Sequence, residues 1–274
     1  MSNIQPHPAK GPKKALGQHF LTAPSFARRI AEAIPAGPED NLLEIGPGCG
    51  ALSVFLKDRF PCFHLVELDR DVIERLRLKL GQGSYTIHIH DILDFDFSIP
   101  GFPLHVVGNL PYSIGAMIIR KTLLYGNNIL SCTFMVQREV AERIVSPPHV
   151  KTNGFLSIFC QFFGKPKIHF HVPPGAFFPP PSVDSSVFQI VIDPDLESKL
   201  PAGLREDFFA FVSRGFSMRR KQLPKILGES GSGGITKERY AAFLDKMGLP
   251  VTSRPEDLGI DEWLELYRLS KEAV

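Results

Sequence analysis

Short apolar runs recur along the first two thirds of the chain, and helical patterns or turns separate them. Each run spans six to eight residues, which is the length of a buried strand rather than of a helix. The predicted strands are 41–46, 62–69, 85–91, 103–109, 132–137, 167–172 and 186–192. Strands that alternate with helices of about ten residues are typical of βαβ units, so we predict an α/β fold with a mainly parallel sheet. A proline-rich loop joins the last two runs, and for them we predict an antiparallel hairpin at the end of the sheet.

The pattern changes beyond residues 193–200. From there on the apolar positions repeat with helical spacing only, in the segments 205–216, 219–227, 237–248 and 261–270. We therefore predict three regions, which are a flexible basic arm over 1–14, an α/β domain over 15–193 and a small all-helical domain over 200–274. A chain of 274 residues is long enough to bury one large core and one small one.

The composition argues against several classes of protein. The net charge of +2 is too small to indicate a nucleic-acid ligand by itself. The four cysteines are too sparse for a disulfide framework and lack the C-x-x-C spacing of a zinc site, so we expect free thiols and no metal. No apolar run reaches the ~18 residues of a membrane span, and the first residues lack the apolar core of a secretory signal. We expect a cytoplasmic protein that makes no membrane contact.

A glycine-rich loop, EIGPGCGALS (44–53), follows the first predicted strand and leads into a predicted helix that runs to about Lys57. Its glycines let the backbone turn tightly and approach a ligand closely. Glu67 ends the second strand, where a carboxylate can accept both hydroxyls of a ribose, and Asp91 ends the third, where it can accept an adenine amine. The loop and the two acids predict a nucleoside cofactor, and both NAD and S-adenosylmethionine fit the loop.

The segment GNLPY (108–112), at the end of the fourth predicted strand, distinguishes these two cofactors. An exocyclic amine on a base is a poor nucleophile because its lone pair is delocalised into the ring. The side-chain oxygen of Asn109 and the backbone carbonyl of Leu110 can accept the two amine hydrogens and favour a pyramidal nitrogen. Pro111 restricts Leu110 to an extended conformation, and Tyr112 provides a ring on which a base taken out of its helix can stack. The segment therefore predicts methyl transfer from S-adenosylmethionine to the exocyclic amine of a base, whereas an NAD-dependent oxidoreductase has no use for it.

With these motifs in order, the sequence resembles the small-subunit ribosomal RNA adenine dimethyltransferases over most of its length. The segments that carry the resemblance are LGQHFL (16–21), EIGPGCGALS (44–53), VELDRD (66–71), HDILDFDF (90–97), GNLPYSI (108–114), FMVQREVAERI (134–144), KTNGFLSIFCQ (151–161), VPPGAFFPPPSVDSSV (172–187) and GFSMRRKQLPKIL (215–227). The resemblance implies a Rossmann-like, S-adenosylmethionine-dependent methyltransferase domain followed by a small helical RNA-binding domain.

The implied reaction adds two methyl groups to each of two adjacent adenosines in the 3′-terminal hairpin loop of small-subunit rRNA, as a step in small-subunit biogenesis. The implied partners are this rRNA and the small ribosomal subunit or its precursor, and we expect the protein to be a monomer.

The resemblance also implies which residues hold the cofactor. His19 and Leu21 contact it from the N-terminal motif, Gly46 lies against its methionine part, Glu67 holds the ribose and Asp91 holds the adenine. His19 departs from the family pattern, since many members carry asparagine at this position. Its contact runs through either the side chain or the backbone.

For catalysis, the resemblance implies that Asn109 serves both the cofactor and the target amine, together with the carbonyl of Leu110. Tyr112 stacks on the target base, and Phe177 packs against that base from the other side.

The helical region carries a group of basic residues between Phe208 and Gly228, with no acidic residue among them. Because this segment resembles the second domain of the family, we expect its cations to bind the rRNA backbone and set its register rather than select a base. These residues are Arg214, Arg219, Arg220, Lys221 and Lys225. The aromatic run over 208–216 has helical spacing, and we predict that it and Trp263 belong to the core.

Two other functions fit part of the sequence. A related group of enzymes dimethylates one adenine of large-subunit rRNA, but the segments 172–185 and 219–227 favour the small-subunit group. A ribosome-assembly factor that binds RNA without catalysis is the second alternative, and the complete set of predicted site residues speaks against it.

Overall fold

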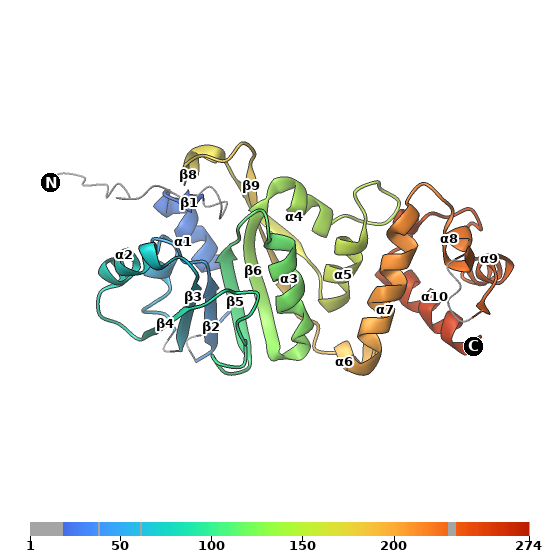
Figure 1. Cartoon of the computed structure of the whole chain (residues 1–274), viewed down its shortest axis with the longest axis horizontal. Coiled ribbons are helices and arrows are strands. Elements are labelled where there is room, and N and C mark those ends of the chain that lie inside the picture. Colours follow the sequence, from blue (N-terminus) through green and yellow to red (C-terminus); the bar gives the residue numbers. More distant parts are fainter. Residues whose placement is uncertain (1–18, 38, 61, 230–233, 274) are drawn as a thin grey trace. The chain divides into compact units, whose positions relative to one another are not determined.

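The computed structural model describes residues 19–37, 39–60, 62–229 and 234–273, and the predicted basic arm lies outside them. The chain divides into two compact units (Figure 1). Among the described residues, the first unit comprises 19–141 and 167–192, and the second comprises 142–166 and 193–273. The sequence pattern placed residues 142–166 in the α/β domain. They belong instead to the second unit, because the aromatic helix within them packs on the C-terminal helices.

The first unit is built on an open sheet in which, among the described residues, seven strands take the order β4-β3-β2-β5-β6-β9-β7. The strands are β2 (Asn41–Ile45), β3 (Phe63–Glu67), β4 (Tyr85–Ile89), β5 (Leu104–Asn109), β6 (Ile129–Gln137), β7 (Lys167–Val172) and β9 (Ser185–Val191). The strands from β4 to β6 pair in parallel, while β9 pairs antiparallel with both β6 and β7. The parallel sheet and the terminal hairpin were both predicted from the sequence, and the structure confirms them.

Helices α1 (Pro24–Ala33), α2 (Arg70–Leu80), α3 (Gly115–Leu124) and α4 (Arg138–Ile144) occur between these strands. Helix α2 begins three residues after the end of β3 and covers the charged stretch RDVIERLRLKL. The carboxylate of Asp69 accepts the backbone N–H of Asp71 at its start, and Gly81, with φ +61°, ends it. Because α2 begins three residues after β3, it anchors the end of that strand, where Glu67 lies, at the edge of the sheet.

The predicted helix between the glycine loop and Lys57 is wrong. The segment forms a series of turns with a single short 3₁₀ helix, η2 (Ser53–Phe55). Gly50 has φ +75°, which a right-handed helix does not allow, so no such helix can include this residue. Beyond it the carbonyl of Ser53 accepts the N–H groups of both Leu56 and Lys57, which tightens the chain into turns.

A second sheet of two strands was not predicted from the sequence. Strand β1 (Phe20–Leu21) pairs antiparallel with β8 (Phe177–Phe178), so that Leu21 lies opposite Phe177 (Figure 1). The backbone N–H and the hydroxyl of Thr22 both donate to the carbonyl of Ala176, at 2.8 and 3.0 Å. This pairing fastens the N-terminal motif to the segment 172–187. A short 3₁₀ helix, η4 (Pro174–Ala176), leads into β8.

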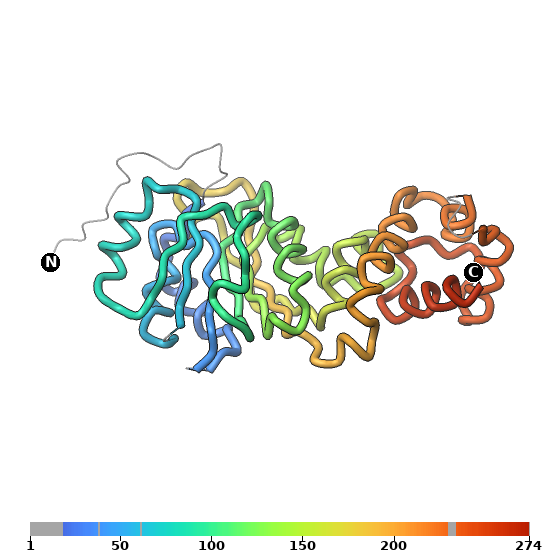
Figure 2. Tube along the Cα trace, turned by 60° about the horizontal axis from the view of Figure 1, so that its bottom comes forward, coloured from blue at the N-terminus to red at the C-terminus, as the bar shows by residue number. Residues whose placement is uncertain are grey.

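The second unit is helical, as predicted, and Figure 2 shows the trace of its C-terminal part in orange and red. They are α5 (Phe155–Phe163), α6 (Leu196–Lys199), α7 (Ala202–Gly215), α8 (Leu223–Glu229), α9 (Lys237–Lys246) and α10 (Ile260–Glu272), with short 3₁₀ helices η5 (Phe216–Met218) and η7 (Pro255–Asp257). Phe159 and Phe162 of α5 pack against Phe209 of α7, and Trp263 of α10 is fully buried. The prediction that these aromatic residues form core is confirmed.

Candidate active site

A cavity of about 270 Å³ lies at the carboxyl ends of β2 to β5 and brings together most of the predicted site residues of the first unit. The predicted residues that line it are His19, Gly46, Glu67, Asp91, Asn109, Leu110 and Tyr112. Leu21 and Phe177 line an adjacent cavity of about 630 Å³, and Gly46 and Asn109 line both. Residues from five separate segments of the chain therefore share one edge of the sheet, where ligands bind in open α/β folds.

The glycine loop is held against Glu67. The backbone N–H of Gly48 donates to Oε2 of Glu67 at 3.0 Å, and the N–H of Asp69 donates to Oε1 at 2.9 Å. Each oxygen keeps a further lone pair with which it can accept a ligand hydroxyl. Burial raises the pKa of Glu67, and these two backbone bonds oppose the shift. Gly48 has φ +52°, and a Cβ there would meet the ring of Phe20 at 2.9 Å, so both the conformation and the space require glycine.

Asp91 lies in a turn, and a side chain of helix α3 forms a hydrogen bond with that turn. Its Oδ1 accepts the N–H of Leu93 at 2.8 Å, which leaves Oδ2 as an acceptor. The ammonium group of Lys121, on α3, donates to the carbonyl of Leu93 at 2.6 Å. Partial burial lowers the pKa of Lys121, and the charges of nearby aspartates oppose that shift. The sequence analysis missed Lys121, because nothing in the spacing connects position 121 with position 93.

Asn109 ends β5 and Leu110 follows it, and backbone groups of other segments hold both residues. The amide Nδ2 of Asn109 donates to the carbonyl of His19 at 3.0 Å, so Oδ1 is left to accept a hydrogen bond. The N–H of Leu110 donates to the carbonyl of Met135 on β6 at 3.0 Å. At Gly108 a Cβ would lie 2.6 Å from the carbonyl oxygen of Ile45, so the strand that carries Asn109 can approach β2 only with glycine there.

Tyr112 is held at its far end by Ser185, with 2.7 Å between their hydroxyl oxygens. Burial raises the pKa of the Tyr112 phenol, which therefore stays protonated at neutral pH. Phe177 is 4% exposed and belongs to the hydrophobic core, whereas its neighbour Phe178 is 43% exposed. The two rings that the sequence predicted around a base therefore line different cavities.

Glu44 is a candidate residue that the sequence analysis did not select. It lines the larger cavity together with Arg75 and Lys79, yet it is only 2% exposed. Its Oε2 has no hydrogen-bond partner among the described residues. Burial raises the pKa of Glu44 to about 8, against the opposing effect of the Ser53 hydroxyl. The available signal was an acidic residue in an otherwise apolar strand, directly before the glycine loop.

In the second unit the predicted RNA-binding residues differ in their surroundings. Arg219 uses Nη2 to donate to the carbonyls of Lys151 and Asn153, at 2.5 and 2.8 Å. Lys221 forms an ion pair with Glu229 at 3.1 Å, an acid just beyond the segment in which the sequence showed none. Arg220 and Lys225 are exposed, whereas Arg214 is only partly exposed.

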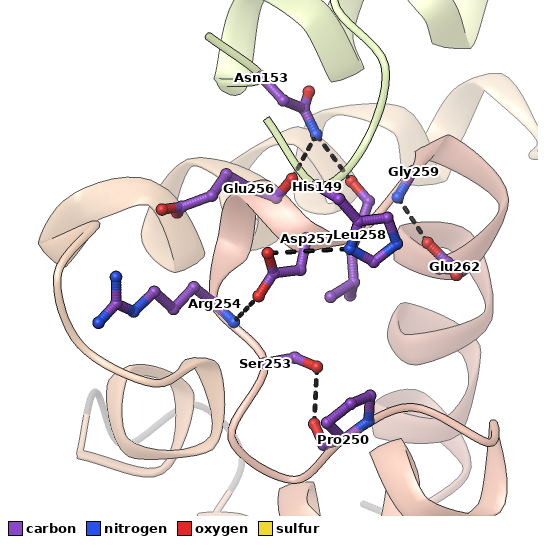
Figure 3. A network of polar contacts seen from close by, with 10 residues as sticks. All are labelled: His149, Asn153, Pro250, Ser253, Arg254, Glu256, Asp257, Leu258, Gly259 and Glu262. Carbon is purple, nitrogen blue, oxygen red and sulfur yellow. Dashed lines mark hydrogen bonds and ion pairs between the residues drawn. The ribbon is translucent and has the colours of Figure 1, made fainter. Parts of the chain in front are cut away.

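The loop that Arg219 holds is fixed from its other side as well. Figure 3 shows the amide of Asn153 donating to the carbonyls of Glu256 and Leu258, at 3.0 Å each. His149 lies 3.9 Å from a carboxylate oxygen of Asp257 in the same view. Asn153 is 1% exposed, and Arg219, itself an exposed residue, donates to its carbonyl from the surface of this unit.

The part of the chain that the structure describes contains no group of three or more His, Cys, Asp or Glu side chains arranged to hold a metal ion. Two histidines of the first unit contact other side chains: His88 lies 2.9 Å from His64, and His171 lies 2.8 Å from the hydroxyl of Ser186. Over the same described residues, no helix is long and apolar enough to cross a membrane.

Comparison with known proteins gives a consistent result. The family model for ribosomal RNA adenine dimethylase matches residues 10–268. A protein of Chromobacterium violaceum named ribosomal RNA small subunit methyltransferase A is 38% identical over 260 residues, which cover 93% of this chain and 94% of that protein. A protein of the same name from Marinobacter nauticus is 38% identical over 272 residues, 98% of this chain and 94% of the relative.

Two solved structures resemble the fold. A dimethyladenosine transferase from Plasmodium falciparum superposes with a TM-score of 0.80 at 22% identity and covers 93% of this chain and 99% of its own. The 23S rRNA methyltransferase ErmE superposes with a TM-score of 0.69 at 23% identity and covers 91% and 98%. At these identities the likeness establishes the fold, a Rossmann-like methyltransferase sheet with a helical C-terminal portion.

Proposed function

This chain belongs to the ribosomal RNA adenine dimethylase family, and on that premise we propose that it methylates the exocyclic amines of adenosines in small-subunit rRNA with S-adenosylmethionine as the donor. The observation that carries the proposal is the cavity at the edge of the sheet, which Glu67, Asp91, Asn109 and Tyr112 line together. The target is two adjacent adenosines of the 3′-terminal hairpin loop, each of which receives two methyl groups. The reaction belongs to the biogenesis of the small subunit in the cytoplasm.

The residues of the cavity fit S-adenosylmethionine. The two oxygens of Glu67 each have a lone pair for a ribose hydroxyl, and Oδ2 of Asp91 is an acceptor for the adenine amine. Beyond the glycine loop, the orphaned Oε2 of Glu44 suits the ammonium group of the methionine part. Arg75 and Lys79 of the same cavity suit its carboxylate. Once bound, this cofactor supplies a methyl group that its sulfonium already activates.

Because the donor is activated, the protein acts mainly by positioning the adenine. Oδ1 of Asn109 accepts one hydrogen of the target amine, since Nδ2 is occupied by the carbonyl of His19. The carbonyl of Leu110 accepts the other. Tyr112 stacks on the base, which has to leave its helix to reach the cavity. Phe177, which is buried and lines the adjacent cavity, is the second ring proposed to pack against the base.

In the second unit, Arg220 and Lys225 contact rRNA phosphates directly, with Lys221 beside them. Arg219 donates to the carbonyls of Lys151 and Asn153 beside the same surface, and Arg214, which is partly exposed, is proposed to bind the same RNA backbone. Contacts of this kind set affinity and register, while the first unit selects the adenine.

A transfer assay with labelled S-adenosylmethionine tests the proposal. We expect label in small-subunit particles isolated from cells that lack this modification, located in dimethyladenosine after hydrolysis of the rRNA. Naked large-subunit rRNA is the comparison substrate. Label in the large-subunit RNA alone would assign the protein to the other group of dimethylases, and binding without any transfer would make it an assembly factor.

The placement of the cofactor has its own test. Replacing Glu67 by alanine removes the acceptors of the ribose hydroxyls, so the affinity for S-adenosylmethionine should fall by roughly 1–3 kcal/mol in calorimetric titration. Unchanged affinity in this variant would show that Glu67 does not bind the ribose of the cofactor.

A further inference from the structure

His19 stands among the proposed catalytic residues through its side chain as well as its backbone. Its ring stacks on that of Tyr112, with 5.4 Å between the centroids and 30° between the planes. Its Nδ1 lies 2.8 Å from the carbonyl oxygen of Pro179, in the proline-rich segment after β8. Its own carbonyl accepts Nδ2 of Asn109. One residue therefore contacts both the NLPY segment and the proline-rich segment.

These contacts fix the orientation of the imidazole ring. A carbonyl oxygen can only accept, so Nδ1 of His19 carries the hydrogen and donates it to Pro179. The ring cannot turn without losing either this bond or the stacking contact with Tyr112. Tyr112 is in turn held at its hydroxyl by Ser185, so its ring is restrained at two points, the hydroxyl and the ring contact with His19.

Neither contact of the imidazole involves a residue that the cofactor proposal uses. Glu67 and Asp91 are fixed by the backbone of their own turns, at Gly48, Asp69 and Leu93. The partners of His19 are instead the residue proposed to stack on the target base, the residue proposed to accept its amine, and the proline-rich segment that follows Phe177.

We propose that the His19 imidazole is a positioning residue of the target-base pocket, which holds the ring of Tyr112 and the turn at Pro179 at the spacing that receives the adenine. The inference rests on the proposed function and deepens it, because it assigns the side chain to the base rather than to the cofactor. An asparagine at position 19 could donate to Pro179 but could not stack on Tyr112, whereas the imidazole makes both contacts.

The test uses the full-length protein, small-subunit particles and single-turnover methyl transfer. His19→Ala should lower the transfer rate about tenfold, as expected when an orienting contact to a reacting group is lost. The affinity for S-adenosylmethionine and the KM for particles should stay within about twofold of the wild type. His19→Phe, which keeps a ring, and His19→Asn, which keeps a donor, should each recover part of the rate. His171→Ala removes a histidine with a similar hydrogen bond, to Ser186, and should leave the rate unchanged.

A double-mutant cycle distinguishes positioning from general support of the fold. If His19 acts through Tyr112, its replacement should cost little further rate in a Tyr112→Leu background, because the ring to be positioned is gone. Fully additive losses, or an unchanged rate in His19→Ala, would overturn the inference. A fall in cofactor affinity that matches the fall in rate would also overturn it, since the imidazole would then belong to the cofactor site. A wild-type protein that transfers no methyl group to adenine would refute the proposed function itself.

Discussion

At the scale of single residues, the burial of Glu44 should make the free energy of unfolding depend on pH. Its folded pKa of about 8 lies above the ordinary value of 4.5, so the ligand-free folded protein keeps a proton that the unfolded chain releases. The stability of the ligand-free protein therefore falls as the pH rises from about 4.5 to about 8. Glu44→Gln should remove this contribution, so it should become more stable than the wild type as the pH rises through that window. Thermal unfolding of both proteins across the window measures it, and parallel curves would contradict the assignment.

The same carboxyl group should respond to the cofactor. A cationic ligand beside Glu44 favours the ionised form, so binding at pH 7 should release up to about one proton. Glu44→Gln should release none. Calorimetric titration in two buffers of different ionisation enthalpy gives the number directly. Equal proton release by both proteins would place the cationic group of the cofactor away from Glu44.

Asn109 is the residue on which the chemistry depends most directly. Asn109→Ala removes the acceptor proposed for the target amine, so the transfer rate should fall on the order of 10²–10³-fold. Binding to the small-subunit particle should change little. Tyr112→Phe is the matched control: it keeps the ring, loses only the bond to Ser185 and should retain much of the rate. An Asn109→Ala protein with near-normal turnover and weakened particle binding would reverse this assignment.

At the scale of elements, α3 connects the two halves of the site. The helix begins shortly after Tyr112, and its Lys121 donates to the carbonyl of Leu93 in the turn that aims Asp91. Lys121→Met keeps the aliphatic stem but loses the bond, and the affinity for S-adenosylmethionine should fall by about tenfold. Arg120→Met, one position earlier on the exposed face of α3, should leave the affinity unchanged. Equal effects of the two substitutions would point to a general loss of helix stability.

Local sequence patterns predicted the strands well but not the sheet formed by β1 and β8. Runs such as 103–109 and 167–172 are long enough for their apolar content to show, and the structure has strands there. Strands β1 and β8 contribute two residues each, from opposite ends of the first unit, so no periodicity reveals them. The helix predicted after the glycine loop was wrong for another reason. Gly46, Gly48 and Gly50 have positive φ, which allows turns where the apolar spacing suggested a helix.

The candidate site shows the same division. Glu67 and Asn109 end strands of a parallel sheet and Asp91 follows a third strand by two residues, so their meeting at one edge could be predicted from topology alone. The contacts of His19 and Lys121 depend on how distant segments pack, and no spacing in the sequence contains that information.

At the scale of the whole molecule, we propose that the first unit carries the chemistry and the second binds rRNA, and the basic residues of the second unit differ in their contacts. Arg219 holds the carbonyls of Lys151 and Asn153, so Arg219→Ala should lower the free energy of unfolding of this unit by roughly 1–3 kcal/mol. Arg220 and Lys225 are exposed, and replacing both by alanine should leave stability unchanged. The double variant should instead weaken particle binding and reduce its salt dependence by up to ~2 units of slope.

Thermal unfolding and particle binding across a salt series measure these two effects, with cofactor affinity as the control in both. If the double variant of Arg220 and Lys225 kept its affinity for the particle and its salt slope, these side chains would be solvent-exposed without contacting the rRNA.

The central claim is that this chain dimethylates two adjacent adenosines of small-subunit rRNA with the residues of its first unit. Mass spectrometry of the 3′-terminal rRNA fragment, from cells with and without the protein, tests it most directly. We expect two adjacent dimethyladenosines in cells that have the protein and unmodified adenosines in cells that lack it. Wild-type protein should restore the modification, and the Asn109→Ala variant should not. An identical fragment in both kinds of cell, or a modification lost from large-subunit rRNA instead, would contradict the claim.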